Sequence, residues 1–162
     1  MFGRRTKALP VRRKRIGVDM ADEAKTPFDY EQLAIYLQKR YHALQQLKKV
    51  TDDFIGAVEH DDDVSARILL DMRNEQIVII DGAWQEILQM GESSQEAHAL
   101  IGRLMLQEPD LAFPENDWEN RIVQMRRRAL ELIDAIKQQD RRMNEHLNKD
   151  RSFYLEKESS RK

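Results

Sequence analysis

Apolar residues recur with helical spacing along three long stretches of the chain, and this pattern limits the possible folds more than any other feature of the sequence. In the first stretch, one seven-residue series starts at Tyr30 and a second starts at Leu33, and both are mostly apolar as far as Val58. A second stretch covers about residues 64–90 and a third about residues 117–157. The pattern predicts an all-α chain with three long amphipathic helices.

Capping and helix-breaking residues divide these stretches. We expect the first helix to open at Thr26-Pro27 and to end near residue 60, because Thr is a good cap and Pro is tolerated in the first turn. Three aspartates at 61–63 then cap the second helix, since carboxylates favour the positive end of a helix dipole. Gly91 closes that helix. Only Arg73 interrupts its apolar stripe, and the guanidinium needs a carboxylate or the surface.

Between the second and third long helices, the sequence predicts a short helix followed by a loop. Ser93 or Ser94 can cap the short helix. The loop at 108–115 contains two prolines, and we expect its apolar residues Leu111 and Phe113 to pin it to the rest of the protein. Asn116, followed three residues later by a glutamate, resembles a capping box at the start of the last helix.

These features predict one domain, an antiparallel helical bundle of three long helices plus one short helix, with coiled-coil-like packing. The bundle is expected over residues 26–157, with the C-terminal helix at about 117–157 and disordered segments at 1–25 and 158–162. A chain of 162 residues can bury one core and is too short for two. The sequence does not decide between a monomer and a homodimer.

The composition indicates the cellular compartment in which the protein is expected. The chain has no cysteine, which removes disulfides and suits a reducing compartment, so a cytoplasmic location is expected. No uninterrupted apolar run, Ile77 to Ile80 included, approaches the ~20 residues of a membrane-spanning helix. The apolar run at 8–11 is short and contains a proline, so we expect neither a membrane span nor a secretory signal.

Positive charge is concentrated at the start of the chain. Residues 1–20 carry seven basic side chains and one acidic one, a net charge of +6, against −2 for the whole chain. Such an arm could touch nucleic acid or an anionic membrane, but it has no amphipathic periodicity. The run Arg126 to Arg128 cannot form one stripe, because consecutive helical residues point ~100° apart. We do not expect nucleic acid as a partner.

The sequence offers no residues for catalysis or for a cofactor. The four histidines lie on four separate segments, without the i, i+4 spacing of a helical zinc site, and the aspartates at 61–63 are explained as a cap. Neither a glycine-rich phosphate loop nor a nucleophile elbow occurs. We therefore expect a protein that binds another protein and is no enzyme, with no metal and no cofactor.

The last helix changes character halfway along. Its seam is apolar at every position from Trp118 to Ile136 and mixed from Gln139 onward. An amphipathic helix that its own bundle leaves partly uncovered is free to lie against a partner. The expected partner-binding residues are Ile133, Ile136, Met143, Leu147, Phe153 and Tyr154, with Arg142 and Lys149 as flanking charges. For Ile133 and Ile136, ordinary core packing explains the pattern equally well.

Two helices resemble those of a known family. After the acidic turn the second helix reads Leu69-Leu70, then Arg73-x-x-x-Ile77, then Ile80-Asp81, and the last helix contains the segment 132–136, Leu-Ile-Asp-Ala-Ile. Over about residues 28–155 the chain is similar to bacterial flagellar export chaperones of the FlgN and FliT type. The resemblance implies a cytoplasmic chaperone whose C-terminal helix holds a type III export substrate unassembled. The implied client is a hook–filament junction or filament-cap protein.

A second interpretation is a coiled-coil adaptor or homo-oligomeric structural protein without enzymatic activity. Such a protein would use the seam from Leu37 to Phe54 between subunits. The two interpretations predict different behaviour. A chaperone truncated after Ile136 should stay folded and lose its client, whereas an adaptor should lose assembly when Leu44 and Leu47 are made polar.

Overall fold

The computed structural model describes the backbone of residues 27–159 and the side chains as far as Lys149. Its elements are α2 (Tyr30–Glu59), α3 (Asp63–Met90), α4 (Gln95–Ile101), the π-helical turn η1 (Gly102–Leu106), the 3-10 turn η2 (Pro109–Leu111) and α5 (Asp117–Ser159). No strand occurs among these residues, and the predicted all-α class is confirmed. The predicted arm at 1–25 and residues 160–162 of the predicted tail lie outside the described residues.

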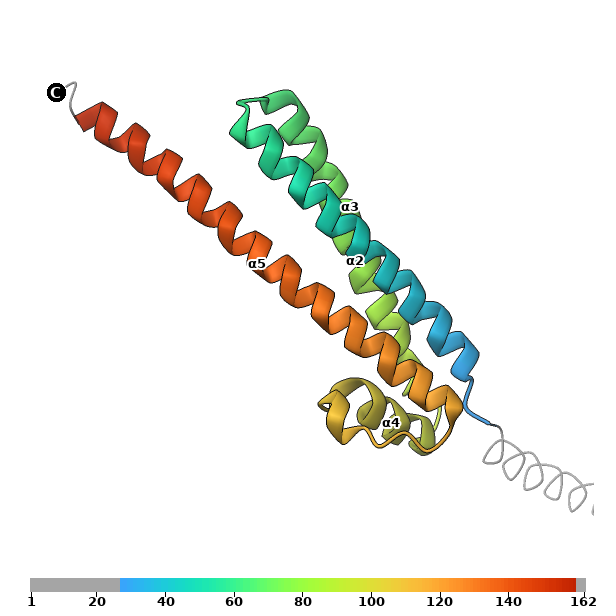
Figure 1. Ribbon diagram of the computed structural model, residues 1–162. Coiled ribbons are helices and arrows are strands. Elements are labelled where there is room, and N and C mark those ends of the chain that lie inside the picture. The colour runs from blue at the N-terminus through green and yellow to red at the C-terminus, as the bar shows by residue number, and fades with distance from the viewer. Residues whose placement is uncertain (1–26, 160–162) are drawn as a thin grey trace, which may run out of the picture.

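The helix α2 packs against both α3 and α5, and α2 and α3 cross in the view of Figure 1. α2 and α3 form a hairpin, so they run in opposite directions, whereas α5 runs along α2 in the same direction. Two hydrogen bonds fix this parallel pairing. The Tyr30 hydroxyl donates to Glu119 at 2.6 Å near the start of both helices, and Gln139 Nε2 donates to the Lys48 carbonyl at 3.1 Å further along. The Cα atoms of α3 and α5 nowhere approach within 8 Å.

Aspartates cap both helices of the hairpin. α2 begins later than predicted, because the Asp29 carboxylate caps it and accepts from the Gln32 amide at 2.9 Å, while the predicted cap Thr26 lies outside the described residues. Asp62 caps α3 in the same way and accepts from the Ser65 amide at 3.0 Å. Hydrogen bonds from the side chain and the amide of Ser65 lower the pKa of Asp62. The turn between the helices is closed by Asp61, whose φ is 55°.

Two apolar clusters along α2 form the core. The first lies at the end of the molecule that holds α4 and is built on Leu33, Leu37, Ile87, Ile101, Leu104, Met105, Ala112, Ile122 and Val123. The second lies further along α2 and is built on Leu44, Leu47, Ala129 and Ile136, with Ile77 and Ile80 packed against it. Residues of α4 and η1 contribute to the first cluster and not to the second. The seam of α2 is therefore buried inside one chain.

A polar layer separates the second cluster from the hairpin tip. Arg73 Nη2 of α3 donates to Asp140 of α5 at 2.8 Å, and Arg73 Nε donates to the Thr51 hydroxyl of α2 at 3.3 Å. Gln139 is buried beside them and bonds to Asp52 as well as to the Lys48 carbonyl. The prediction that the Arg73 guanidinium would find a carboxylate is confirmed. Such a layer favours one register of the three helices, because a slipped register would leave these groups unpaired.

Residues 91–116 fold back against the start of α5. Ser94 caps α4 by accepting from the Ala97 amide at 3.0 Å. The buried Gly91 allows the close turn between α3 and α4, since a Cβ there would lie 3.3 Å from the Cβ of Ile101. Asn116 caps α5 as predicted, and its side-chain oxygen accepts from the Glu119 amide at 2.9 Å.

The prediction that Leu111 and Phe113 pin the loop is wrong. Their side chains are 53% and 68% exposed, and the residue buried between them is Ala112. The loop is held instead by Arg103, whose Nη1 donates to the carbonyls of Ala112 at 2.8 Å and Phe113 at 3.1 Å. These backbone contacts need no large apolar side chain from the loop, so both large residues remain outside.

Candidate partner-binding surfaces

The helix α5 continues beyond the tip of the α2–α3 hairpin (Figure 1). Near the tip, Met143, His146 and Leu147 line a cavity of about 10 Å³ together with Phe54, Ile55 and Val58 of α2. α2 ends one residue later, at Glu59, whereas α5 runs on to Ser159. At 1.5 Å per residue, the part of α5 after Leu147 extends roughly 18 Å further.

The structure describes the side chains of six of the eight predicted partner-binding residues, and these six do not share one surface. Ile136 is 6% exposed and belongs to the core, so ordinary packing accounts for it. Ile133 and Met143 are half-buried, and each lines a cavity. Leu147 is 42% exposed, and Arg142 and Lys149 are exposed beside it. The side chains of Phe153 and Tyr154 lie outside the described residues.

A hollow of about 240 Å³ lies where α3 and α5 both flank α2. Its walls are Ile77 and Ile80 from α3 and Ile133 and Ile136 from α5, and α2 contributes Leu44 and Leu47. Two cationic side chains, Arg40 of α2 and Lys137 of α5, complete the lining. We call this cavity the three-helix hollow. The sequence pointed to its α5 wall only, because the wall from α3 depends on which helix lies opposite.

Arg40 is the most constrained charge of the three-helix hollow. Its guanidinium carbon lies 5.0 Å from the centre of the Trp84 ring, a cation–π distance. Its Nε is buried and has no hydrogen-bond acceptor. Burial lowers the pKa of Arg40, attraction to Asp81 opposes this shift, and repulsion from Arg126 adds to it. The apolar hollow is therefore lined by a largely buried cation, whose positive charge acts on the space.

The outward surface of α3 carries apolar side chains that the sequence interpretation missed. Val64, Ile68, Met72 and Ile79 are exposed and recur at intervals of four or seven residues, so they share one side of the helix. The stripe that we predicted, through Ile77 and Ile80, points towards α2. α3 is therefore apolar on two sides. The sequence contains this second apolar side as another series of apolar residues with helical spacing.

The loop before α5 carries the other exposed apolar group. Leu106, Leu111 and Phe113 are exposed there, and Phe113 has a φ of 44°, an unusual value for a bulky residue. Trp118, predicted in the seam of α5, is also exposed and lies 5.7 Å from the guanidinium of Arg121. The position next to it, Glu119, is the buried one. The predicted seam of α5 therefore fails at its first position and holds from Ile122, which is fully buried.

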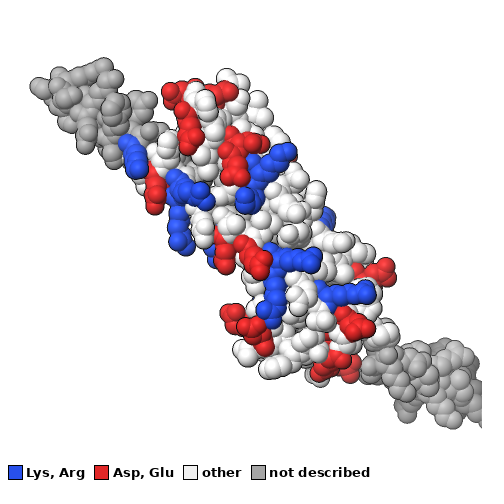
Figure 2. All heavy atoms as spheres, in the orientation of Figure 1, with Lys and Arg blue, Asp and Glu red and all other residues white. Residues whose placement is uncertain are grey.

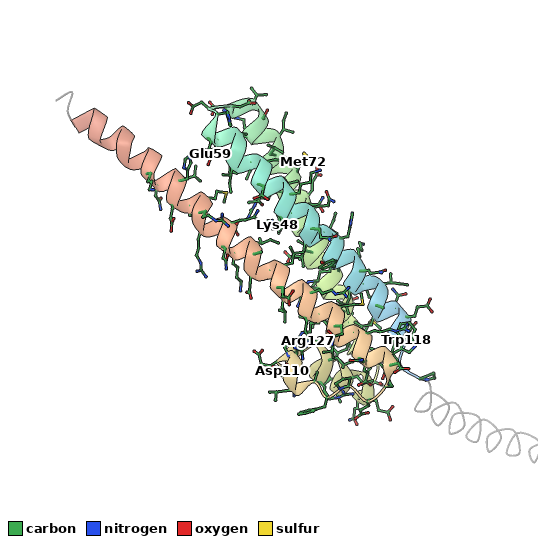
Figure 3. The ribbon with its side chains drawn as sticks, viewed as in Figure 1. Lys48, Glu59, Met72, Asp110, Trp118 and Arg127 are labelled. Carbon is green, nitrogen blue, oxygen red and sulfur yellow. The ribbon has the colours of Figure 1, made fainter. Side chains whose placement is uncertain are left out.

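Basic and acidic side chains are interspersed on the face of the molecule shown in Figure 2, without a continuous basic stripe there. Two of the three consecutive arginines of α5 hold the preceding segment in place. Arg126 donates to the Leu104 carbonyl at 3.1 Å, and Arg127 pairs with Asp110 at 2.6 Å (Figure 3). They are therefore structural contacts, and Arg128 alone of the three is exposed.

Two classes of site do not occur in the described part of the chain. Between residues 27 and 149, no three His, Cys, Asp or Glu side chains come together where they could hold a metal ion. None of the helices there combines the length and apolar character that crossing a bilayer requires.

Comparison of the chain with protein-family models, with curated proteins and with solved structures gives no match.

Proposed function

We propose that this protein is a cytoplasmic chaperone that binds a flagellar, type III export substrate and keeps it unassembled. The client would be a hook–filament junction or filament-cap protein, bound through the part of α5 that follows the polar layer. The proposal takes the three long helices and one short helix as a coiled-coil-like bundle in which successive long helices run antiparallel. Binding would be stoichiometric, without turnover or cofactor.

One observation carries this proposal, namely that α5 outruns the helix on which it packs. Its first half buries Ile122, Ala129 and Ile136, so that half belongs to the core. Past the polar layer, Leu147 is 42% exposed although it lies one turn after the half-buried Met143, and α5 continues to Ser159. An amphipathic helix exposed in this way can pair with a helix of another protein. The resemblance in α3 and α5 adds the choice of an export client.

The test uses two purified proteins of the source organism, its hook–filament junction protein and its filament-cap protein. Each is titrated into the full chain, into Leu147→Glu and into the control Leu111→Glu, which places the same charge on an exposed leucine of the loop. We expect a 1:1 complex with one of the two clients. Leu147→Glu should weaken it by at least about tenfold, equivalent to ~1.4 kcal/mol, with no effect of Leu111→Glu.

Two results would count against the proposal. One is the absence of a complex with either client. The other is an equal loss of affinity in both variants, which would place the contact elsewhere. A chain that ends after Asn148 gives a second measurement, because it retains every α5 contact with α2 described above. That chain should unfold at nearly the same urea concentration as the full chain while binding the client more weakly.

The alternative, a homo-oligomeric adaptor, would need a different surface from the one predicted. Leu37, Leu44, Leu47 and Phe54 are buried within one chain, so they are not available between subunits. The exposed stripe on α3 favours this alternative, because an apolar face of that length is a plausible subunit contact. Sedimentation of Ile68→Glu against the unchanged chain tests it. If the unchanged chain and Ile68→Glu both sediment as monomers, the adaptor alternative is excluded and the chaperone proposal remains.

A further inference from the structure

The three-helix hollow has the shape of an unfilled position in a helical bundle. α3 and α5 each pack on α2, but their Cα atoms stay more than 8 Å apart. Isoleucines from both helices therefore face a shared space instead of one another, and leucines of α2 form its floor. A fourth helix would close such a space, because helix packing buries the groove between neighbouring helices.

The size of the three-helix hollow points to a side chain rather than a separate small molecule. Its volume is about 240 Å³. Sites for small organic ligands are usually larger, roughly 300–1,000 Å³, and enclose most of the ligand. The hollow lies between helices and is of a size to take one or two large apolar side chains. Anchor side chains of this kind contribute most of the energy of many protein interfaces.

The charge of the three-helix hollow also limits which partners can bind there. Lys137 is exposed and forms no ion pair or hydrogen bond with the described residues. Arg40 has a buried Nε without an acceptor, as described above. Both cations line the same apolar space. A carboxylate close to an apolar anchor would pair with them, and a basic group would be repelled.

We propose that the three-helix hollow is an anchor site for an amphipathic helix of a partner protein that carries an aspartate or glutamate within one turn of a large apolar residue. This inference rests on the proposed function, since it takes the client to supply that helix. It adds Ile77, Ile80, Arg40 and Lys137 to the client surface. It also requires an acidic residue in the client segment that binds.

The probe is a library of helical peptides displayed on phage and selected on the immobilised full chain. Selected peptides are synthesised with a fluorophore, and their affinity is measured by anisotropy. Lys137→Glu reverses the exposed cation. Ile133→Trp fills the three-helix hollow. The control Arg128→Glu makes the same charge change on the same helix, and nine residues correspond to half a turn, so it lies on the opposite face.

We expect the selected peptides to contain an acidic residue next to an apolar anchor. Lys137→Glu and Ile133→Trp should each weaken binding at least about tenfold, while Arg128→Glu leaves it unchanged. The melting temperature of Ile133→Trp should not fall, since the new ring occupies existing space. The inference is overturned if no peptide is selected, if acidic residues are not enriched, or if neither hollow variant changes the affinity.

The two proposals fail in different ways. If the selected peptides bind the three-helix hollow but neither purified export substrate forms a complex, the anchor site stands and the export client is wrong. If an export substrate binds and is lost in Leu147→Glu but not in Lys137→Glu or Ile133→Trp, the chaperone proposal stands and the anchor site is wrong.

Discussion

Replacement of Glu119 tests how the segment between α4 and α5 is held. This carboxylate is 1% exposed. It accepts hydrogen bonds from Arg103 Nη1 at 2.7 Å, from the Tyr30 hydroxyl at 2.6 Å and from the Glu115 amide at 3.3 Å. Because Arg103 also holds the carbonyls of the loop, one buried anion connects α2, η1, the loop and α5.

The size of the effect follows from these contacts. Removing one partner of a buried ion pair costs about 3–5 kcal/mol, since the other charge is left uncompensated. The Arg103 side chain is 23% exposed and retains its carbonyl acceptors, so we expect the lower limit, about 3 kcal/mol, for Glu119→Ala. Glu119→Gln keeps the volume and weakens two charge-assisted bonds, which should cost about 2 kcal/mol.

The assay is urea unfolding followed by far-ultraviolet circular dichroism at several pH values. Burial raises the pKa of Glu119, but hydrogen bonds from Arg103 and Tyr30 outweigh it and hold the pKa below its ordinary value of 4.5. A carboxyl with a lowered pKa in the folded state stabilises the protein above its unfolded pKa, and this stabilisation is lost as the pH falls through the folded pKa. The free-energy difference between the unchanged chain and Glu119→Gln should therefore be full at neutral pH and shrink below pH 4.5.

A matched control is Glu131→Gln, which neutralises an exposed glutamate of the same helix and should change stability little. The reasoning is refuted if Glu119→Gln unfolds at the same urea concentration as the unchanged chain at neutral pH. A difference that stays constant from neutral to acidic pH would also refute it, because the carboxylate would then not be the source.

Three further substitutions test local features by thermal or urea unfolding. Gly82→Ala should stabilise the protein by about 0.5–1 kcal/mol, because Gly82 lies inside α3 and a methyl group there meets nothing within 4 Å; a loss would mean that the site is crowded. Phe113→Gly should stabilise by about 1 kcal/mol, since it relieves a φ of 44° on an exposed residue; a large loss would show that the ring packs. Arg73→Ala should destabilise by about 2 kcal/mol through the lost bonds to Asp140 and Thr51; no loss would remove the polar layer as a register device.

The long helices could be predicted because their apolar spacing persists over many turns. The ends of these helices are predicted less precisely, because neighbouring residues compete for the cap position. Thr26 and Asp29 are both good caps and lie three residues apart, and the sequence does not show which one folds against the first turn. The start of α3 at the acidic turn 61–63 was easier to predict, because the helical spacing of apolar residues begins directly after Asp62.

Contacts between distant segments explain the errors around α5. Trp118 looked like a seam residue because it is large and apolar, yet Glu119 takes the buried position. The carboxylate can be buried only because Arg103 and Tyr30, from two other elements, surround it. Nothing in the spacing of α5 reveals those partners. The exposure of Phe113 has the same origin, since Arg103 holds the backbone of its loop.

The candidate site was only partly accessible from the sequence. The weakening of the α5 seam after Ile136 was visible, and the structure shows its cause in the polar layer around Gln139. That Ile133 and Ile80 line the same hollow was not visible, because this depends on the distance between α3 and α5. Lys137 and Arg40 acquire a shared role only through that arrangement.

Hydrogen–deuterium exchange of the full chain, with and without a purified hook–filament junction or filament-cap protein, tests most directly whether and where the proposed client binds. We predict slower exchange in α5 from Lys137 onward and in α3 around Ile77 to Ile80, with no change in the loop from Leu106 to Glu115. The loop is the informative comparison, because it carries the competing exposed apolar group. Slower exchange confined to the loop, with α5 unchanged after Lys137, would contradict client binding by the far half of α5.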